Sequence, residues 1–447
     1  MTDLEPITQA LIEAARKAGA DAADALAIDG TSISIDVREG KLEQAERSEG
    51  IEVGLRVLIG QKQATVSASD TRAETLATLA ERAVAMARLA PDDPYVGLAP
   101  SDRLATRRDA EGLEMSDPAG EPSPDALRDD ALAVEAAAQA VAGVSQVASA
   151  TAAYGQRRVF LSASNGFSGG YARTDRAMSC AAIAGEGTGM ERDFAGESRI
   201  FAADLPPAEE IGAKAGQRAV ERLGARKPPT GAFPVLYDER VSSSLIGHLL
   251  SAVNGAAVAR GSSWLRDALG ELILPDALTL TEDPHRPRAS GSRYFDAEGL
   301  PTQTRNVIEA GRLTGWTLDL ANARKLGMQS TANAARGTSS APSPQITNVA
   351  LTQGHQTRAD LVRDMGTGLL VTSMIGASIN PTTGDYSRGA SGFWVENGEI
   401  AYPVNECTVA GNLRDMLRTL VPANDARQHL SHIVPSLLVQ GLTIAGA

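Results

Sequence analysis

The strictest pattern in this chain is an alternation of apolar and polar residues between residues 51 and 59. The apolar positions are Ile51, Val53, Leu55, Val57 and Ile59. Because successive side chains of a strand point to opposite faces of its sheet, this period of two predicts a strand with one buried face. A weaker alternation at residues 33–37 and a run at 62–69 predict two neighbouring strands. Turns at Glu39-Gly40 and at Gly60 make the three strands an antiparallel meander.

Two predicted helices flank this meander. The segment 4–18 is amphipathic and ends at Gly19, and the segment 73–89 follows a capping residue at Asp70 or Thr71. A helix, a meander and a second helix together form a compact α+β unit.

The length of 447 residues predicts two or three domains. We predict an N-terminal α+β unit with a linker over 1–118, a middle α+β unit over 119–228, and a strand-rich C-terminal unit over 229–447. The C-terminal unit carries one prominent helix, near residues 242–260. The middle unit begins with a helix near 125–142, and its strands are expected near residues 145–153, 157–162, 169–173 and 177–184. The fold class is therefore α+β.

Composition excludes several classes of protein. The net charge of −13 disfavours direct contact with nucleic acid, whose phosphates would be repelled. The two cysteines, Cys180 and Cys407, do not make a disulfide framework. No apolar run approaches the roughly 20 residues that a membrane span needs, and the first residues do not resemble a signal peptide. We therefore expect a cytoplasmic protein that does not enter membranes.

Common catalytic motifs are missing from the sequence. The chain has five histidines, and none of them belongs to a His-Glu-x-x-His motif. They are His248, His285, His355, His429 and His432. His429 and His432 are three residues apart, but no third ligand accompanies them. There is also no nucleophile elbow and no phosphate-binding loop.

Two places remain open to a structural or a functional interpretation. His248 adjoins the apolar stripe of the helix near 242–260, so it is either a core residue or a functional one. The segment 384–400 brings Asp385, Tyr386 and Arg388 together beside a glycine-rich turn. This second place is either a hairpin with a charged loop, with its turn at Asn397-Gly398, or a binding site.

The same segment carries a resemblance to a known family. GDYSRGASGFWVENGEIAYPV, at residues 384–404, closely resembles the TldE (PmbA) branch of the TldD/PmbA family. Further segments that agree lie at residues 247–249, 262–265, 323–327, 365–369, 406–413 and 441–446. The resemblance covers nearly the whole chain.

The resemblance implies a cytoplasmic metallopeptidase made of two related subunits. The TldD subunit carries His-Glu-x-x-x-His and a later cysteine that completes its zinc site. In this chain Ser243 stands at the first ligand position, Ser244 at the position of the catalytic glutamate, and His248 at the second ligand position. A serine hydroxyl is a poor zinc ligand and cannot serve as the general base. We therefore expect no metal in this chain and zinc in the partner subunit.

The leading hypothesis is a metal-free subunit that completes a peptidase acting on small or unfolded peptides. The resemblance suggests antitoxin degradation and the maturation of peptide antibiotics. The partner is a TldD-like sister in a heterodimer, or a second copy of this chain. The alternative hypothesis is a homodimeric, non-enzymatic peptide-binding or regulatory protein. The candidates for the substrate cavity are His248, Asp385, Tyr386 and Arg388. Asp385 and Arg388 either order their loop through an ion pair, receive peptide termini, or only fix the turn.

Overall fold

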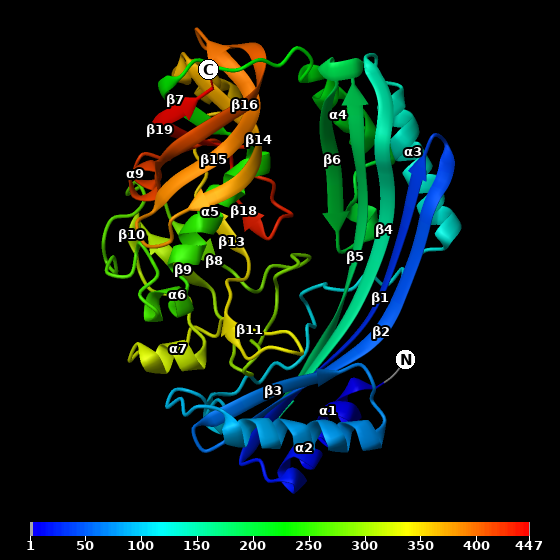
Figure 1. Cartoon of the computed structure of the whole chain (residues 1–447), viewed down its shortest axis with the longest axis vertical. Helices are drawn as coiled ribbons and strands as arrows, with labels where there is room; N and C mark the ends of the chain where they lie inside the picture. Colours follow the sequence, from blue (N-terminus) through cyan, green and yellow to red (C-terminus); the bar gives the residue numbers. More distant parts are fainter. Residues whose placement is uncertain (1–2, 447) are drawn as a thin grey trace.

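The computed structural model describes residues 3–446, and the first half of the chain forms one long antiparallel sheet (Figure 1). The sheet has six strands in the order β3-β2-β1-β4-β5-β6. They are β1 (Ala22–Arg38), β2 (Lys41–Ile59), β3 (Lys62–Ala68), β4 (Val144–Ala163), β5 (Ser168–Ala184) and β6 (Glu191–Arg199). In the alternating segment of β2, Val53, Leu55 and Val57 are fully buried. The predicted meander and the α+β class are confirmed.

Strands β4 and β5 are longer than we predicted. We expected breaks at residues 154–156 and 174–176, whereas β4 runs for 20 residues and β5 for 17. Gly155 interrupts the side-chain pattern, but its backbone stays in register with Ser32 and Asp175. A residue without a side chain weakens the hydrophobic signal of a strand without removing its ladder of hydrogen bonds.

Two pairs of helices cover the two ends of this sheet. Helices α1 (Leu4–Ala18) and α2 (Ala73–Leu89) pack on one end, at the bottom of Figure 1. Helices α3 (Pro124–Gln139) and α4 (Ala208–Glu221) pack on the other end. Both pairs contact odd-numbered positions of β1, which leaves the even-numbered positions facing the other way. The predicted N-terminal and middle units thus share one sheet, and the boundary at residue 118 stays a prediction.

The second half of the chain contains two further sheets. A six-stranded sheet has the order β16-β15-β14-β7-β19-β17, and a five-stranded sheet has the order β10-β9-β8-β13-β18. The first comprises β7 (Gly231–Tyr237), β14 (Gly368–Ile379), β15 (Asp385–Glu396), β16 (Glu399–Asn412), β17 (Val421–Pro422) and β19 (Leu437–Ala445). The second comprises β8 (Leu280–Glu282), β9 (Arg305–Glu309), β10 (Arg312–Leu313), β13 (Val349–Leu351) and β18 (His432–Ile433). A small pair, β11 (Ala334–Ala335) and β12 (Ser343–Pro344), and the helices α7 (Leu320–Lys325), α8 (Arg358–Met365) and α9 (Leu413–Arg418) complete this half.

The single helix predicted near 242–260 is two helices, α5 (Glu239–Ala252) and α6 (Gly255–Ala259). The break occurs because the Asn254 side chain accepts a hydrogen bond from Ala256 N and so caps a new helix. Gly255 also packs closely on the Thr317 carbonyl, where a side chain would collide. A helix-favouring sequence therefore yields to a local cap and a tertiary contact.

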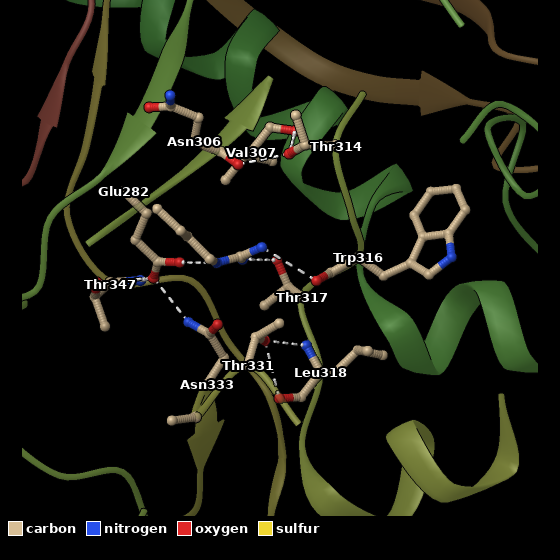
Figure 2. A network of polar contacts seen from close by, with 12 residues as sticks. Glu282, Asn306, Val307, Thr314, Trp316, Thr317, Leu318, Thr331, Asn333 and Thr347 are labelled. Carbon is tan, nitrogen blue, oxygen red and sulfur yellow. Dashed lines mark hydrogen bonds and ion pairs between the residues drawn. The ribbon is translucent and has the colours of Figure 1, made fainter. Parts of the chain in front are cut away.

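A polar network centred on Glu282 supports the five-stranded sheet (Figure 2). Glu282 Oε2 accepts a hydrogen bond from Arg305 Nε at 2.8 Å, and its Oε1 accepts from Asn333 Nδ2 and from Thr347 N, both at 2.7 Å. Arg305 continues the network by donating to Thr317 Oγ1 at 3.0 Å. A buried carboxylate with this many donors ties β8 to β9 and to two loops.

A buried ionic joint connects the long sheet to the second half of the chain. Asp24 on β1 accepts hydrogen bonds from Arg56 Nε on β2, at 2.8 Å, and from Arg336 Nη1, which follows β11. All three side chains are almost completely buried. Beside the joint, Gly54 lies against the Thr338 carbonyl so closely that a Cβ there would be 2.0 Å from its oxygen.

We expect Gly54→Ala to lower the free energy of unfolding by about 1–3 kcal/mol, because the added methyl group forces apart two packed backbones. Gly50→Ala, on the same strand, is the matched control, since no atom of residues 3–446 lies within 4 Å of a Cβ at that position. Urea denaturation followed by circular dichroism measures both variants. Equal midpoints for the two would contradict the close contact.

Candidate functional site

Helix α5 carries the positions at which the resemblance predicts altered metal ligands. It starts after β7, where the Asp238 side chain accepts a hydrogen bond from Arg240 N at 3.1 Å and caps the first turn. The helix is α-helical throughout. Ser243 and His248 are therefore separated by roughly 140° around its axis, at about 100° per residue. They do not converge on one point.

Four side chains from α5 and β15 do come together, namely Ser244, His248, Tyr386 and Arg388. Arg388 donates through Nη1 to Ser244 Oγ at 3.3 Å. The rings of His248 and Tyr386 meet edge to face, with centroids 5.9 Å apart. The arginine is also anchored through Nε to the Gly376 carbonyl of β14, at 2.7 Å. We call this group the arginine–histidine cluster.

Asp385 and Ser243 do not belong to the arginine–histidine cluster. Asp385 accepts a hydrogen bond from Thr383 Oγ1 at 2.6 Å and another from Asn412 Nδ2 at 3.1 Å. The ion-pair interpretation of Asp385 and Arg388 is wrong, because these residues lie within strand β15 rather than in a loop. Residues three apart in a strand point to opposite faces of the sheet.

Two further side chains, Met374 and Tyr237, adjoin the arginine–histidine cluster and were not singled out in the sequence. The Tyr386 hydroxyl donates to Met374 Sδ at 3.5 Å, and Tyr237, fully buried at the end of β7, lies next to it. Burial raises the pKa of both tyrosines, that of Tyr237 well above its usual value. Their phenols are therefore neutral donors at neutral pH. The one available sign was the position of Tyr237 directly before the helix cap.

His248 is neutral at neutral pH and has an unused ring nitrogen. Burial lowers its pKa, and the positive charge of Arg388 lowers it further. Its Nε2 is buried and has no hydrogen-bond partner among residues 3–446. Most buried polar groups are satisfied, so a free nitrogen here points toward a ligand or another chain.

The residues present do not fit a zinc ion. Zinc in proteins takes Cys, His, Asp or Glu ligands, usually three or four of them. Nowhere in the described part of the chain do three such side chains gather around one point. Around His248 the neighbours are a serine, a tyrosine and a guanidinium. The guanidinium places a fixed positive charge where a divalent cation would have to come close.

Strand β14 offers an unpaired backbone edge beside the arginine–histidine cluster. It pairs with β7 only through residues 369–371, and Asp238 N donates to the Val371 carbonyl at the end of that pairing. Within residues 3–446, no strand pairs with 372–379 on the side away from β15. Ile375 is 76% exposed on this segment. A free edge of this kind can accept an extended chain as an additional strand.

Three family models match consecutive parts of the chain. They are the PmbA/TldA metallopeptidase domain 1 at residues 23–87, the central domain at 117–223 and the C-terminal domain at 230–446. Among residues 3–446, no helix combines the length and the apolar character that a membrane crossing requires.

Comparison with individual proteins agrees over the full length. The chain is 37% identical to metalloprotease PmbA of Escherichia coli O157:H7 over 446 residues, which cover 99% of this chain and 96% of that protein. It is 35% identical to a PmbA homolog of Haemophilus influenzae, with coverage of 97% and 94%. A TldD homolog of Buchnera aphidicola is 26% identical over 213 residues, 46% of this chain and 44% of that one.

Solved structures share the fold. The crystal structure of a proposed modulator of DNA gyrase from Bacteroides thetaiotaomicron has a TM-score of 0.90 at 28% identity, with both chains covered completely. TldE from Thermococcus kodakarensis has a TM-score of 0.85 at 21% identity, covering 98% of this chain and 100% of that one, which shows the fold alone. These matches define a chain of the metallopeptidase class. It belongs to the PmbA/TldD metallopeptidase family, as the sequence motifs indicated.

The lowered pKa of His248 predicts a specific loss of stability in acid. The unfolded chain takes up a proton on this histidine below pH of about 6.5, whereas the folded chain does so only at lower pH. Stability is therefore complete above about pH 6.5 and declines as the pH falls toward the folded pKa. We expect His248→Gln to lose less stability than the parent between pH of about 7 and about 5.

Urea denaturation at the two pH values measures this difference. His355→Gln, which removes an exposed histidine, controls for the loss of one imidazole. The prediction fails if His248→Gln and the parent lose stability equally on acidification.

Proposed function

We propose that this chain is the metal-free subunit of a two-subunit metallopeptidase. A TldD-like sister chain would hold the zinc ion and perform the hydrolysis. This chain would close the substrate cavity and bind peptide backbone. The substrates would be small or unfolded peptides in the cytoplasm, a class that includes antitoxins and peptide-antibiotic precursors by resemblance to the family.

One observation supports the metal-free role above the others, and it is the contact between Arg388 and Ser244 beside His248. In the sister motif, two histidines and a glutamate serve a divalent cation. Here the remaining histidine faces a guanidinium, which keeps one positive charge in place without any ligand set. Reversion of the two serines alone would leave that charge in the way of a metal.

The free edge of β14 supports a role in holding peptides. A peptidase that accepts many sequences must bind what they share, which is the backbone. The edge at residues 372–379 offers unpaired backbone groups within reach of Arg388, which is bonded to Gly376 on that strand.

The partner is the finer part of the proposal. The similarity of this chain to a TldD homolog, 26% over 213 residues, supports a partner that is itself related to this chain. Related chains commonly pair with pseudo-twofold symmetry. The alternative is a homodimeric, non-enzymatic peptide-binding or regulatory protein. Direct action on DNA is disfavoured in either case by the net charge of −13.

We expect the purified chain to contain no stoichiometric zinc and to cleave peptides only after the sister chain is added. The reason is that this chain offers one histidine where zinc needs three or four ligands. Metal analysis by mass spectrometry and a peptidase assay with and without the sister measure the two outcomes. One tightly bound zinc per chain, or full activity of this chain alone, would falsify the proposal. Activity that the sister shows equally without this chain would favour the regulatory alternative.

We expect Arg388→Ala to lower kcat/KM of the assembled complex by roughly tenfold or more, since it removes a charged hydrogen-bond donor from the cavity. Asp385→Ala is the matched control, because it changes the opposite face of the same strand. Co-purification and circular dichroism establish that both variants assemble. Equal activity of the two variants would mean that the arginine–histidine cluster does not contact the substrate.

A further inference from the structure

The face of the long sheet opposite the helices lines an open cavity of about 770 Å³. Its floor consists of small residues on adjacent strands. Gly30 lies directly opposite Gly50, and among residues 3–446 no atom lies within 4 Å of a Cβ at Gly50. Such a floor lets another backbone approach closely.

This cavity continues into a smaller one of about 130 Å³ between the sheet and the second half of the chain. The two share Ile28, Arg157 and Arg173 in their linings. The walls of the smaller cavity are mostly apolar, with Leu161 from the sheet and Phe295 from the other side. A single water needs only roughly 10–15 Å³ of such space, so this one admits a side chain. We call it the arginine pocket.

Two of its arginines face each other without a counter-ion. Arg157 on β4 lies directly opposite Arg173 on β5, an arrangement of like charges that destabilises a sheet. Arg173 donates to the Ser290 carbonyl at 2.9 Å. Neither arginine forms an ion pair with any residue from 3 to 446. An anion between them would remove the repulsion.

The two arginines from the other wall have unused donors. In both Arg293 and Arg336, Nε and Nη2 are buried and have no hydrogen-bond partner in the described part of the chain. The Arg336 side chain is completely buried, at 0% exposure. Unpaired buried donors of this kind are rare and costly in native proteins. They indicate a missing acceptor.

The carboxylate that lines the arginine pocket is already occupied. Asp296 Oδ1 accepts hydrogen bonds from Glu298 N at 2.9 Å and Leu300 N at 3.0 Å, and Oδ2 accepts from Ala334 N at 3.0 Å. Two of these backbone donors belong to its own loop and the third to β11. Arg157, Arg173 and Arg293 form no ion pair within residues 3–446, so positive charge in the lining exceeds the charge of this one carboxylate and favours an added anion.

We propose that the arginine pocket binds the free carboxylate of an apolar residue, the C-terminal residue of a peptide whose remaining backbone lies along the glycine floor. Arginine pairs with carboxylate through parallel hydrogen bonds, and the apolar walls receive the side chain. An inorganic phosphate would match the charges but not the apolar walls. The proposal deepens the peptidase-subunit role and rests on it.

Isothermal titration calorimetry of the purified chain tests the pocket with three probes: N-acetyl-leucine, N-acetyl-leucine amide and inorganic phosphate. We expect the acid to bind at least about tenfold more tightly than the amide, because the amide lacks the charge, and more tightly than phosphate. No heat with the acid, equal binding of acid and amide, or tighter binding of phosphate would overturn the proposal.

Variants locate the binding. Arg157→Gln removes an exposed, unpaired charge without disturbing the core, and it should weaken binding of the acid by about tenfold or more. Arg293→Gln should do the same from the other wall. Arg128→Gln, an exposed arginine of α3, makes the same change of charge elsewhere and should leave affinity unchanged. Unaltered affinity in Arg157→Gln would overturn the assignment even if Arg293→Gln does not fold.

These measurements use the chain alone and are independent of zinc and of the sister. If the chain alone does not bind the acid, but the peptidase complex still needs this chain for activity, the arginine pocket is refuted and the peptidase-subunit role is retained. If the chain binds the acid, but the complex with the sister is inactive, the peptidase-subunit role is refuted and the pocket is retained.

Discussion

The Asp24 carboxylate, held between Arg56 and Arg336, is the interaction on which the arrangement of this molecule depends. Burial alone would raise the pKa of Asp24, but the two guanidinium groups outweigh it, and the pKa lies below its usual value. A buried ion pair adds little stability over apolar side chains, whereas removal of one partner costs about 3–5 kcal/mol. The buried ionic joint therefore mainly fixes the position of the second half of the chain relative to the long sheet. It holds the second half of the chain against the long sheet, and the close contact of Gly54 with the Thr338 carbonyl adds a second constraint on their relative position.

The arginine pocket follows from that placement, because neither half of the chain contains it alone. Strands β1, β4 and β5 supply one wall, and the loops around Phe295 and Arg336 supply the other. Arg336 takes part in both features, since its Nη1 is bonded to Asp24 while its Nε and Nη2 have no hydrogen-bond partner among residues 3–446. The same guanidinium thus fixes the two halves and presents donors to the space between them. A ligand that used those donors would also stabilise the joint.

Sequence patterns predicted the elements whose signals are local and missed what tertiary contacts decide. The alternation at 51–59 and the turn at Asn397-Gly398 are local, and both are present, the latter with positive φ at both residues. The length of β4 was missed because Gly155 has no side chain to continue the pattern. The break at Asn254 was missed because a helix cap competed with helix propensity.

At the site, the sequence singled out His248, Tyr386 and Arg388, and the structure brings them together. The sequence alone grouped Asp385 with these three residues, because the segment around Asp385 was interpreted as a loop and not as a strand. Tyr237 and Met374 reach the cluster from β7 and β14, and no spacing in the sequence relates those strands to α5.

The local charge at the two proposed sites is opposite in sign to the net charge of the chain. The net charge is −13, yet the two places proposed to contact peptide, the arginine pocket and the arginine–histidine cluster, both contain arginine. Inside a cavity with apolar walls, water screens charge less than it does on the surface, so a few arginines there act more strongly on a bound group than many exposed carboxylates. Arginine also keeps its charge at any physiological pH, unlike His248, whose pKa already lies below its usual value. The positive charge beside His248 is therefore fixed by Arg388 and does not change with physiological pH. A fixed charge of this kind is compatible with the proposed role in positioning peptides.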